Sequence, residues 1–275
     1  MNTQTFALPQ VSFPAWGELR TAQPAWYYTG LAHMALMVVC LGLSFVDERT
    51  FNDVSVWSKP FKFALSLGVY FFTIAWFAQY VRPGALETKS GRVLIALPIL
   101  MAAFEMPYIT IMGALGEASH FNFSSPFYAT MYSLMGIGAV TMVAVLPWLG
   151  WLVIRAYGFA HPQAFAIFIG LVLTFALGGG FGGYLGSSGG HWVNAPATDA
   201  NGVFLFNWTR EGGDLRVAHF FGMHAMQVIP LFALLLPQTW ASHVRIALIV
   251  AVSAAFTAFT TMTFVQAIGG QPFLG

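Results

Sequence analysis

Ionisable side chains inside apolar stretches are the residues of this sequence that could do chemistry. Glu105 lies within the apolar run 93–114, and His224 lies within the run 215–237. Burying such groups in a membrane costs several kcal/mol, so they are retained mainly where they bind a proton, a metal or a substrate. If both runs are helices, the two side chains lie about 14 Å below the same end. We therefore expect Glu105 and His224 to meet.

A metal site is the chemistry that these residue types favour. The expected ligands are Glu105, His120, His219 and His224, and imidazole with carboxylate suits zinc, iron, copper or manganese. An open position on zinc would lower the pKa of a bound water to about 7 and favour hydrolysis. His219 and His224 differ by about 140° around an ideal helix. A π-bulge at Gly222 would bring them together.

Simpler interpretations exist for each of these groups. A histidine inside a span can make a structural hydrogen bond between helices, and Glu105 can be protonated and bonded to a neighbouring helix. His120 lies in the polar segment 117–122, where it could also be a solvated loop residue.

Basic residues near the same ends of the apolar runs could hold an anionic group. Lys59 and Lys62 are the expected substrate-binding residues, for a phosphate, a carboxylate or an anionic lipid headgroup. The alternative is that both lysines extend along the helix to the membrane surface. Arg210 and Arg216 are the expected cofactor-binding residues, where they would hold the propionates of a haem.

Asp214 precedes the sixth apolar run and is expected to cap its helix. Asp214 and Glu105 are also the two expected catalytic carboxylates.

The composition limits the class of protein to which these residues can belong. The chain has 275 residues, of which 57% are hydrophobic and only 8% are charged, and its mean hydropathy is +0.70. A soluble domain is about 25% charged. This composition excludes a disordered chain and a nucleic-acid-binding protein, while the net charge of +1 argues neither for nor against a charged partner. The single cysteine, Cys40, excludes an internal disulfide.

Seven apolar runs are long enough to span a bilayer as helices. We predict an all-α polytopic bundle of seven transmembrane helices, with residues 1–275 forming a single transmembrane domain. Slightly more basic residues flank the N-terminal side, which favours a cytoplasmic N-terminus and places the expected site on the periplasmic side. The predicted spans are 27–46, 62–81, 93–114, 127–154, 163–184, 215–237 and 244–268.

Three short motifs carry a resemblance that covers roughly residues 47–270. They are Trp-Ser-Lys-Pro-Phe-Lys-Phe at 57–63, Ser-His-Phe-Asn at 119–122 and Gly-Asp-Leu-Arg-Val-Ala-His-Phe at 213–220. The sequence is similar in these motifs to a group of uncharacterised bacterial multi-pass membrane proteins. The resemblance implies a bacterial inner membrane and no particular chemistry.

Several functions fit these observations. We expect a metal-dependent membrane enzyme that acts on an anionic or lipid-like substrate. A haem b cytochrome, with His219 or His224 as an axial ligand, is an alternative. A proton- or cation-coupled transporter that uses Glu105 and His224 is another. The last alternative is a structural subunit of a larger assembly.

Overall fold

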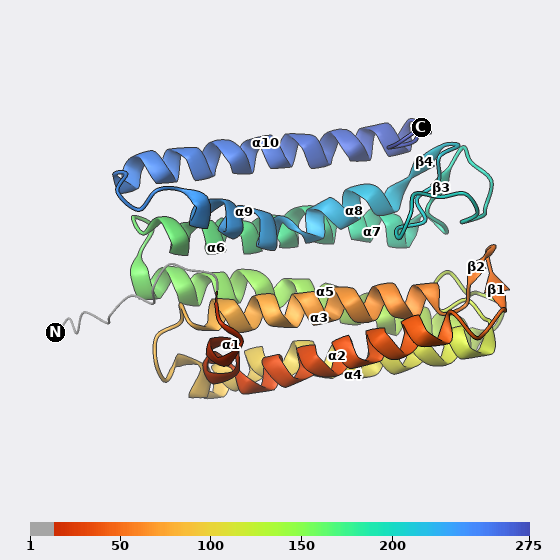
Figure 1. Cartoon of the computed structure of the whole chain (residues 1–275), viewed down its shortest axis with the longest axis horizontal. Coiled ribbons are helices and arrows are strands. Elements are labelled where there is room, and N and C mark those ends of the chain that lie inside the picture. The colour runs from red at the N-terminus through yellow and green to blue at the C-terminus, as the bar shows by residue number, and fades with distance from the viewer. Residues whose placement is uncertain (1–13) are drawn as a thin grey trace.

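The computed structural model describes residues 14–275, and residues 1–13 of the expected single domain lie outside the described part. The chain is almost entirely helical, with two short antiparallel strand pairs, β1–β2 and β3–β4 (Figure 1). The helices are α1 (Trp16–Ala22), α2 (Pro24–Leu43), α3 (Ser58–Ala78), α4 (Lys89–Leu115), α5 (Pro126–Tyr157), α6 (Pro162–Leu173), α7 (Gly179–Ser187), α8 (Leu215–Met223), α9 (Ala225–Leu235) and α10 (Ser242–Ile268). The shorter elements are β1 (Thr50–Phe51), β2 (Val54–Ser55), the 3₁₀-helix η1 (Ala85–Glu87), the π-helix η2 (Thr174–Gly178), β3 (Trp192–Val193) and β4 (Gly213–Asp214).

Among the described residues, six helical segments are long and apolar enough to cross a membrane. They correspond to the first five predicted runs and the last one, and the fifth is the continuous stretch Pro162–Ser187 formed by α6, η2 and α7. The sixth run is instead two helices, α8 and α9, which are bent by 47°. The prediction of an all-α membrane protein is therefore confirmed. The seventh crossing remains a prediction, because a bent pair is also compatible with a re-entrant loop.

The local sequence determines where several helices begin, because it supplies their N-capping side chains. The Ser125 hydroxyl accepts a hydrogen bond from the amide of Tyr128, and the Asp214 carboxylate accepts one from the amide of Arg216. These caps satisfy amide groups that have no partner inside the helix. The predicted N-cap role of Asp214 is confirmed. α3 begins at Ser58, so Lys59 and Lys62 both lie near its N-terminus.

The two irregular helical segments lie against each other. The π-helix η2 interrupts the fifth span, while α8 and α9 separate at His224 in the sixth. A Cβ atom at Gly222 would lie 2.6 Å from the backbone nitrogen of Gly178, so only glycine allows this approach. A π-bulge that would bring His219 and His224 together does not occur at Gly222, which lies in the regular helix α8. The π-helix lies instead in the fifth span.

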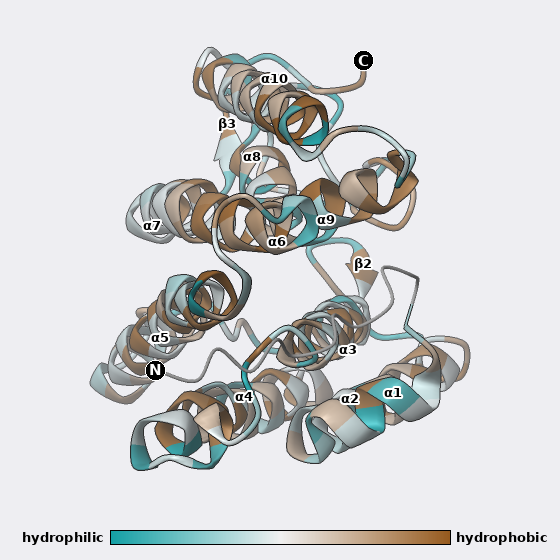
Figure 2. Ribbon diagram, turned by 90° about the vertical axis from the view of Figure 1, so that its left-hand side faces the viewer, coloured by the Kyte–Doolittle hydropathy of each residue, from teal (hydrophilic) through white to brown (hydrophobic). Residues whose placement is uncertain are grey.

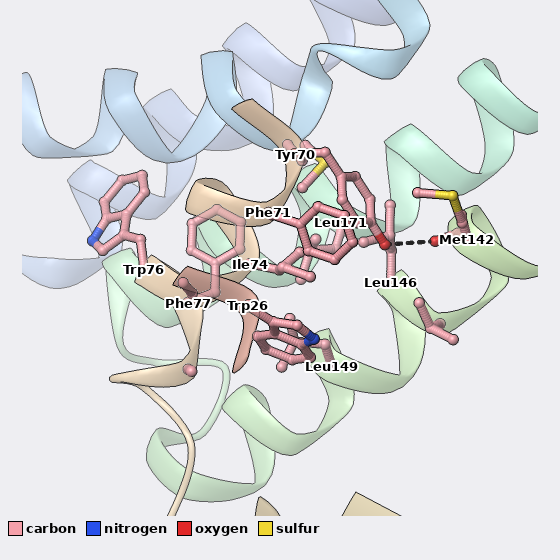
Figure 3. Packing of buried hydrophobic residues seen from close by; sticks show 14 of the residues in the cluster. Trp26, Tyr70, Phe71, Ile74, Trp76, Phe77, Met142, Leu146, Leu149 and Leu171 are labelled. Atoms are coloured by element: carbon pink, nitrogen blue, oxygen red, sulfur yellow. Dashed lines mark hydrogen bonds between the residues drawn. The ribbon is translucent and has the colours of Figure 1, made fainter. Parts of the chain in front are cut away.

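The long helices run side by side along the length of the molecule, with α10 at one edge and α2 and α4 at the other (Figures 1 and 2). The main apolar core lies between α2, α3, α5 and α6, where Trp26, Phe71 and Leu149 are almost fully buried (Figure 3). The Tyr70 hydroxyl donates a hydrogen bond to the Met142 carbonyl across this core.

One end of the molecule carries most of the irregular chain. The segments 44–57, 116–125 and 188–214 all lie there, together with the strands and the C-terminus (Figure 1). We call this the hairpin end. The opposite end carries α1, η1 and the short connections of α5 to α6 and α9 to α10.

Cysteine labelling from the two sides of the membrane tests whether α8 and α9 cross it. In a Cys40→Ala background, Thr239→Cys should react from the same side as Glu87→Cys, because seven crossings put both residues at the end opposite the hairpins. Glu211→Cys should react from the other side. Labelling of Thr239→Cys from the Glu211 side would show that the bent pair re-enters and does not cross.

Candidate functional site

Arg216 is the centre of a buried ion-pair network at the hairpin end. Its Nη2 atom lies 2.6 Å from Asp214 Oδ2 and 2.8 Å from Asp199 Oδ1, and it donates a 2.6 Å hydrogen bond to the Asn207 carbonyl. The Asp214 carboxylate also accepts a hydrogen bond from the Thr209 amide, and only 1% of this residue is exposed. The network therefore ties the segment 188–214 to the first turn of α8.

The ring of His191 lies beside this network. Its Nδ1 atom is 3.6 Å from Asp214 Oδ1, and its Nε2 atom is 3.9 Å from Asp199 Oδ1. Burial lowers the pKa of His191, while Asp214 opposes that shift. Burial alone would raise the pKa of Asp214, but the His191 ring and the Arg216 guanidinium hold it well below its usual range. Asp214 is therefore a carboxylate at neutral pH.

Lys59 and Lys62 lie next to the network, on the first two turns of α3. Lys62 Nζ donates hydrogen bonds to Asn207 Oδ1 at 2.8 Å and to the Phe206 carbonyl at 3.3 Å, both neutral oxygens. Lys59 makes no hydrogen bond or ion pair with any described residue, and its Nζ lies 5.9 Å from the centre of the Phe63 ring. We call Lys59, Lys62 and Arg216 the cation cluster.

His120 lies close to the cation cluster. Its ring is 5.4 Å from the Phe63 ring, centre to centre, and its Nδ1 atom lies 3.1 Å from the Ser119 hydroxyl. Burial, together with the nearby Lys59 ammonium, holds the pKa of His120 well below its usual range. His120 is therefore a neutral imidazole that lines the cluster, and the alternative of a fully solvated loop residue does not describe this half-buried side chain.

His219 and His224 each have one ring nitrogen held by an oxygen acceptor. His219 Nδ1 lies 2.9 Å from the carbonyl of Gly178, the last residue of the π-helix, and Gly182 leaves room for the ring. His224 Nδ1 lies 3.3 Å from Gln227 Oε1. Because these oxygens accept, both Nδ1 atoms donate, and the Nε2 atom of each ring keeps a free lone pair.

A polar chain leads from His224 toward α3. Gln227 Nε2 donates a 3.0 Å hydrogen bond to the Thr73 hydroxyl, which in turn donates to the Val69 carbonyl. These hydrogen bonds connect the break between α8 and α9 with α3.

Glu105 lies elsewhere, on α4, where its carboxyl group contacts α5. Its side chain packs directly against Gly138, and Oε1 is buried with no hydrogen-bond partner among the described residues. Within residues 14–275, no three His, Cys, Asp or Glu side chains are close enough together to hold a metal ion. The expected metal set of Glu105, His120, His219 and His224 is therefore not supported. The reason is that α4 packs on α5, whereas α8 packs on η2 and α7.

The two expected cofactor-binding arginines differ in their surroundings. Arg210 is exposed and makes no side-chain hydrogen bond or ion pair within the described part of the chain. Arg216 is engaged by two carboxylates and a carbonyl. Sequence reasoning missed Asp199, Asn207 and Thr73, which are polar partners of the predicted residues. No local spacing marks them, since their contacts with the predicted residues are made across loops or between helices.

No protein-family model, curated protein or solved structure matches the chain.

The buried charge of Asp214 predicts a pH-dependent loss of stability. Asp214→Asn keeps a capping side chain but removes the charge that pairs with Arg216, so it should lower the free energy of unfolding by roughly 3 kcal/mol at pH 7. The pKa of Asp214 is lowered in the folded state, so the carboxylate stabilises the fold above the ordinary aspartate pKa and loses this effect as the pH falls further.

Thermal and denaturant unfolding in detergent between pH 7 and pH 3 measures this effect. The gap between the wild-type protein and Asp214→Asn should narrow as the solution becomes acidic. The exposed Glu211→Gln serves as the control and should unfold like the wild type. A gap that stays constant over this pH range would contradict the assigned role of the carboxylate.

Proposed function

We propose that this integral membrane protein binds an anionic small molecule or lipid headgroup at the cation cluster. The observation that carries the proposal is the position of Lys59 and Lys62 beside Arg216, with no carboxylate of residues 14–275 in contact with either ammonium group. Both nearby carboxylates, Asp199 and Asp214, are already paired with Arg216. A phosphate or carboxylate group would supply the missing negative charge.

The helix start at this place favours the same ligand. Two lysines at a helix N-terminus lie at its electropositive end, which is an unfavourable position for cations. The first turn of α3 has amide groups at Ser58 and Lys59, whereas Pro60 has none. An anion placed there would be stabilised by both the amides and the lysines. Lys62 is held in position by Asn207, which limits the entropy lost on binding.

Charge distribution in the loops supports one orientation for this site. The basic residues flanking the predicted spans favour the hairpin end on the periplasmic side of a bacterial inner membrane.

His219 and His224 support a second element of the proposal. They would bind a transition metal that acts on the bound anion. Metal-binding histidines usually donate their other ring N–H to an oxygen acceptor, and both His219 and His224 do so. Two imidazoles cannot complete a zinc site, which needs three or four ligands. The remaining positions would come from water or from the anionic ligand, so the metal would be open to substrate. A haem b with one of these histidines as axial ligand is the alternative.

Lysine substitutions test the anion site. Lys59→Met and Lys62→Met should each weaken binding of inorganic pyrophosphate by roughly tenfold, because each removes a charge-assisted contact. The affinity of the wild-type protein should fall as salt is added. The control is Lys89→Met, which removes an exposed lysine at the opposite end. Thermal shift in detergent measures binding, and nanodiscs with and without phosphatidylglycerol separate a free anion from a lipid headgroup.

Lys89→Met could weaken pyrophosphate binding as much as the α3 substitutions do. In that case nonspecific electrostatic attraction explains the result, and the proposal of an anion site at the cation cluster is wrong.

Metal analysis of the detergent-purified protein tests the second element. Elemental analysis should find a transition metal in the wild-type protein, and both His219→Ala and His224→Ala should lose it. His243→Ala removes an exposed histidine and should retain the metal. A Soret band in the visible spectrum would identify haem b in place of a bare ion. A metal-free, colourless preparation would remove this element and leave the anion site to be judged separately.

A further inference from the structure

Arg245 is a buried arginine without a counter-ion, at the end of the molecule opposite the hairpins. It lies in the first turn of α10, about 4.5 Å along the helix from Ser242. Only 6% of the residue is exposed. Its Nε atom is enclosed without a hydrogen-bond partner, and its guanidinium forms no ion pair with any residue of 14–275. An arginine side chain stays charged, so it does not avoid the cost of burial by losing a proton.

The neighbouring helices contain no carboxylate that could neutralise Arg245. The segments 126–198 and 215–275, which include α5 to α10, have no Asp or Glu. The acidic residues at this end are Glu18 on α1 and Glu87 on η1. α1 lies at the far edge of the bundle from α10, and η1 packs on α4 (Figure 2). The negative charge that Arg245 needs therefore comes from outside the chain.

The start of α10 is itself electropositive. The N-cap residue, Ala241, has no side chain that accepts a hydrogen bond, so the amide groups of the first turn lack a capping partner. Side chains of a helix lean toward its N-terminus, which directs the Arg245 guanidinium to these amides. A cation is unfavourable at this end of a helix, whereas an anion is stabilised there. The helix end and the arginine therefore favour the same kind of ligand.

His161, the N-cap residue of α6, lies near Arg245 and supplies no negative charge. Its Nδ1 atom accepts a 3.1 Å hydrogen bond from the Ala164 amide, so the neutral ring carries its hydrogen on Nε2 and donates there. Burial, together with the Arg245 guanidinium, lowers the pKa of His161. The ring is therefore neutral at pH 7, and it offers neither a charge nor an acceptor nitrogen to Arg245.

This place lies at the level of the lipid headgroups. α10 is a candidate membrane span that begins at Ser242, and it forms one edge of the molecule (Figure 1). Trp240, just before the span, is 47% exposed. Tryptophan is enriched where a membrane protein crosses the interface between lipid and water. The phosphate groups of a bilayer are found at the same level, and basic pockets between membrane helices bind lipid headgroups.

We propose that Arg245 and the first turn of α10 bind the phosphate group of an anionic phospholipid. The guanidinium donates to two phosphate oxygens, a geometry that arginine favours. The uncapped amides of α10 stabilise the same charge. A free phosphate has the same chemistry, but the lipid is present at this level in every membrane. The site lies at the end opposite the cation cluster and does not depend on it.

Counting of bound lipids tests this assignment. The full chain in detergent is titrated with phosphatidylglycerol, with phosphatidylcholine and with inorganic phosphate, and native mass spectrometry counts the bound molecules. One phosphatidylglycerol should bind roughly tenfold more tightly than phosphatidylcholine, whose choline group offsets the phosphate charge. Arg245→Gln should lose this molecule. Arg155→Gln, which removes an exposed arginine at the same end, should retain it.

Two results would overturn the proposal. One is a folded Arg245→Gln protein that retains every phosphatidylglycerol molecule of the wild type. The other is inorganic phosphate binding as tightly as the lipid, which would identify a free anion as the ligand. In a Lys62→Met background Arg245→Gln should still remove one lipid, so a failure of the cation cluster as a binding site does not affect this test.

A second substitution keeps the test informative if Arg245→Gln fails to fold. Ser242 is exposed and lies three residues before Arg245, on the same face of α10. Ser242→Glu gives Arg245 a counter-ion from the chain and is favourable at a helix start. Phosphatidylglycerol should bind roughly tenfold more weakly to Ser242→Glu than to the uncharged Ser242→Gln. Equal binding to these two variants would contradict the role of Arg245.

Discussion

The ion pairs of Arg216 with Asp214 and Asp199 are the interaction on which the hairpin end depends. They join the segment 188–214 to the start of α8, and Asn207 extends the connection to Lys62 on α3. If one partner is removed, a charge is left buried and unpaired, which is far more costly than losing an exposed salt bridge. The same contacts set where α8 begins and therefore where His219 lies.

Irregular backbone in the interior gives His219 and His224 their hydrogen-bond partners. The π-helix η2 presents the Gly178 carbonyl to His219, and the break at His224 lets that ring bond to Gln227. Non-helical backbone at membrane depth is tolerated where it is buried in protein and where polar partners satisfy it. Broken helices of this kind occur at the binding sites of transport proteins, which is consistent with the polar contact between α3 and α9.

The polar groups of the bundle are distributed over separate helix pairs and do not form a single centre. The cation cluster has excess positive charge and favours an anion. Glu105, between α4 and α5, has a buried oxygen with no hydrogen-bond partner in the described structure. The unpaired polar groups of the two places therefore differ in charge and in position.

The sequence by itself determined the class of the protein and most of its helices. Hydropathy located the apolar runs, because a spanning helix must be long and almost free of charge. Asp214 as a helix cap also followed from local sequence, since a cap depends only on neighbouring residues. Equal depth predicted that Glu105 and His224 would meet, but depth along a helix does not say which helices are neighbours. Only the tertiary structure placed Glu105 against α5 and His219 against η2, because helix order in a bundle is decided by packing between distant segments. The same packing brought Asp199 and Asn207 to the lysines of α3, across separations in sequence that no local pattern records.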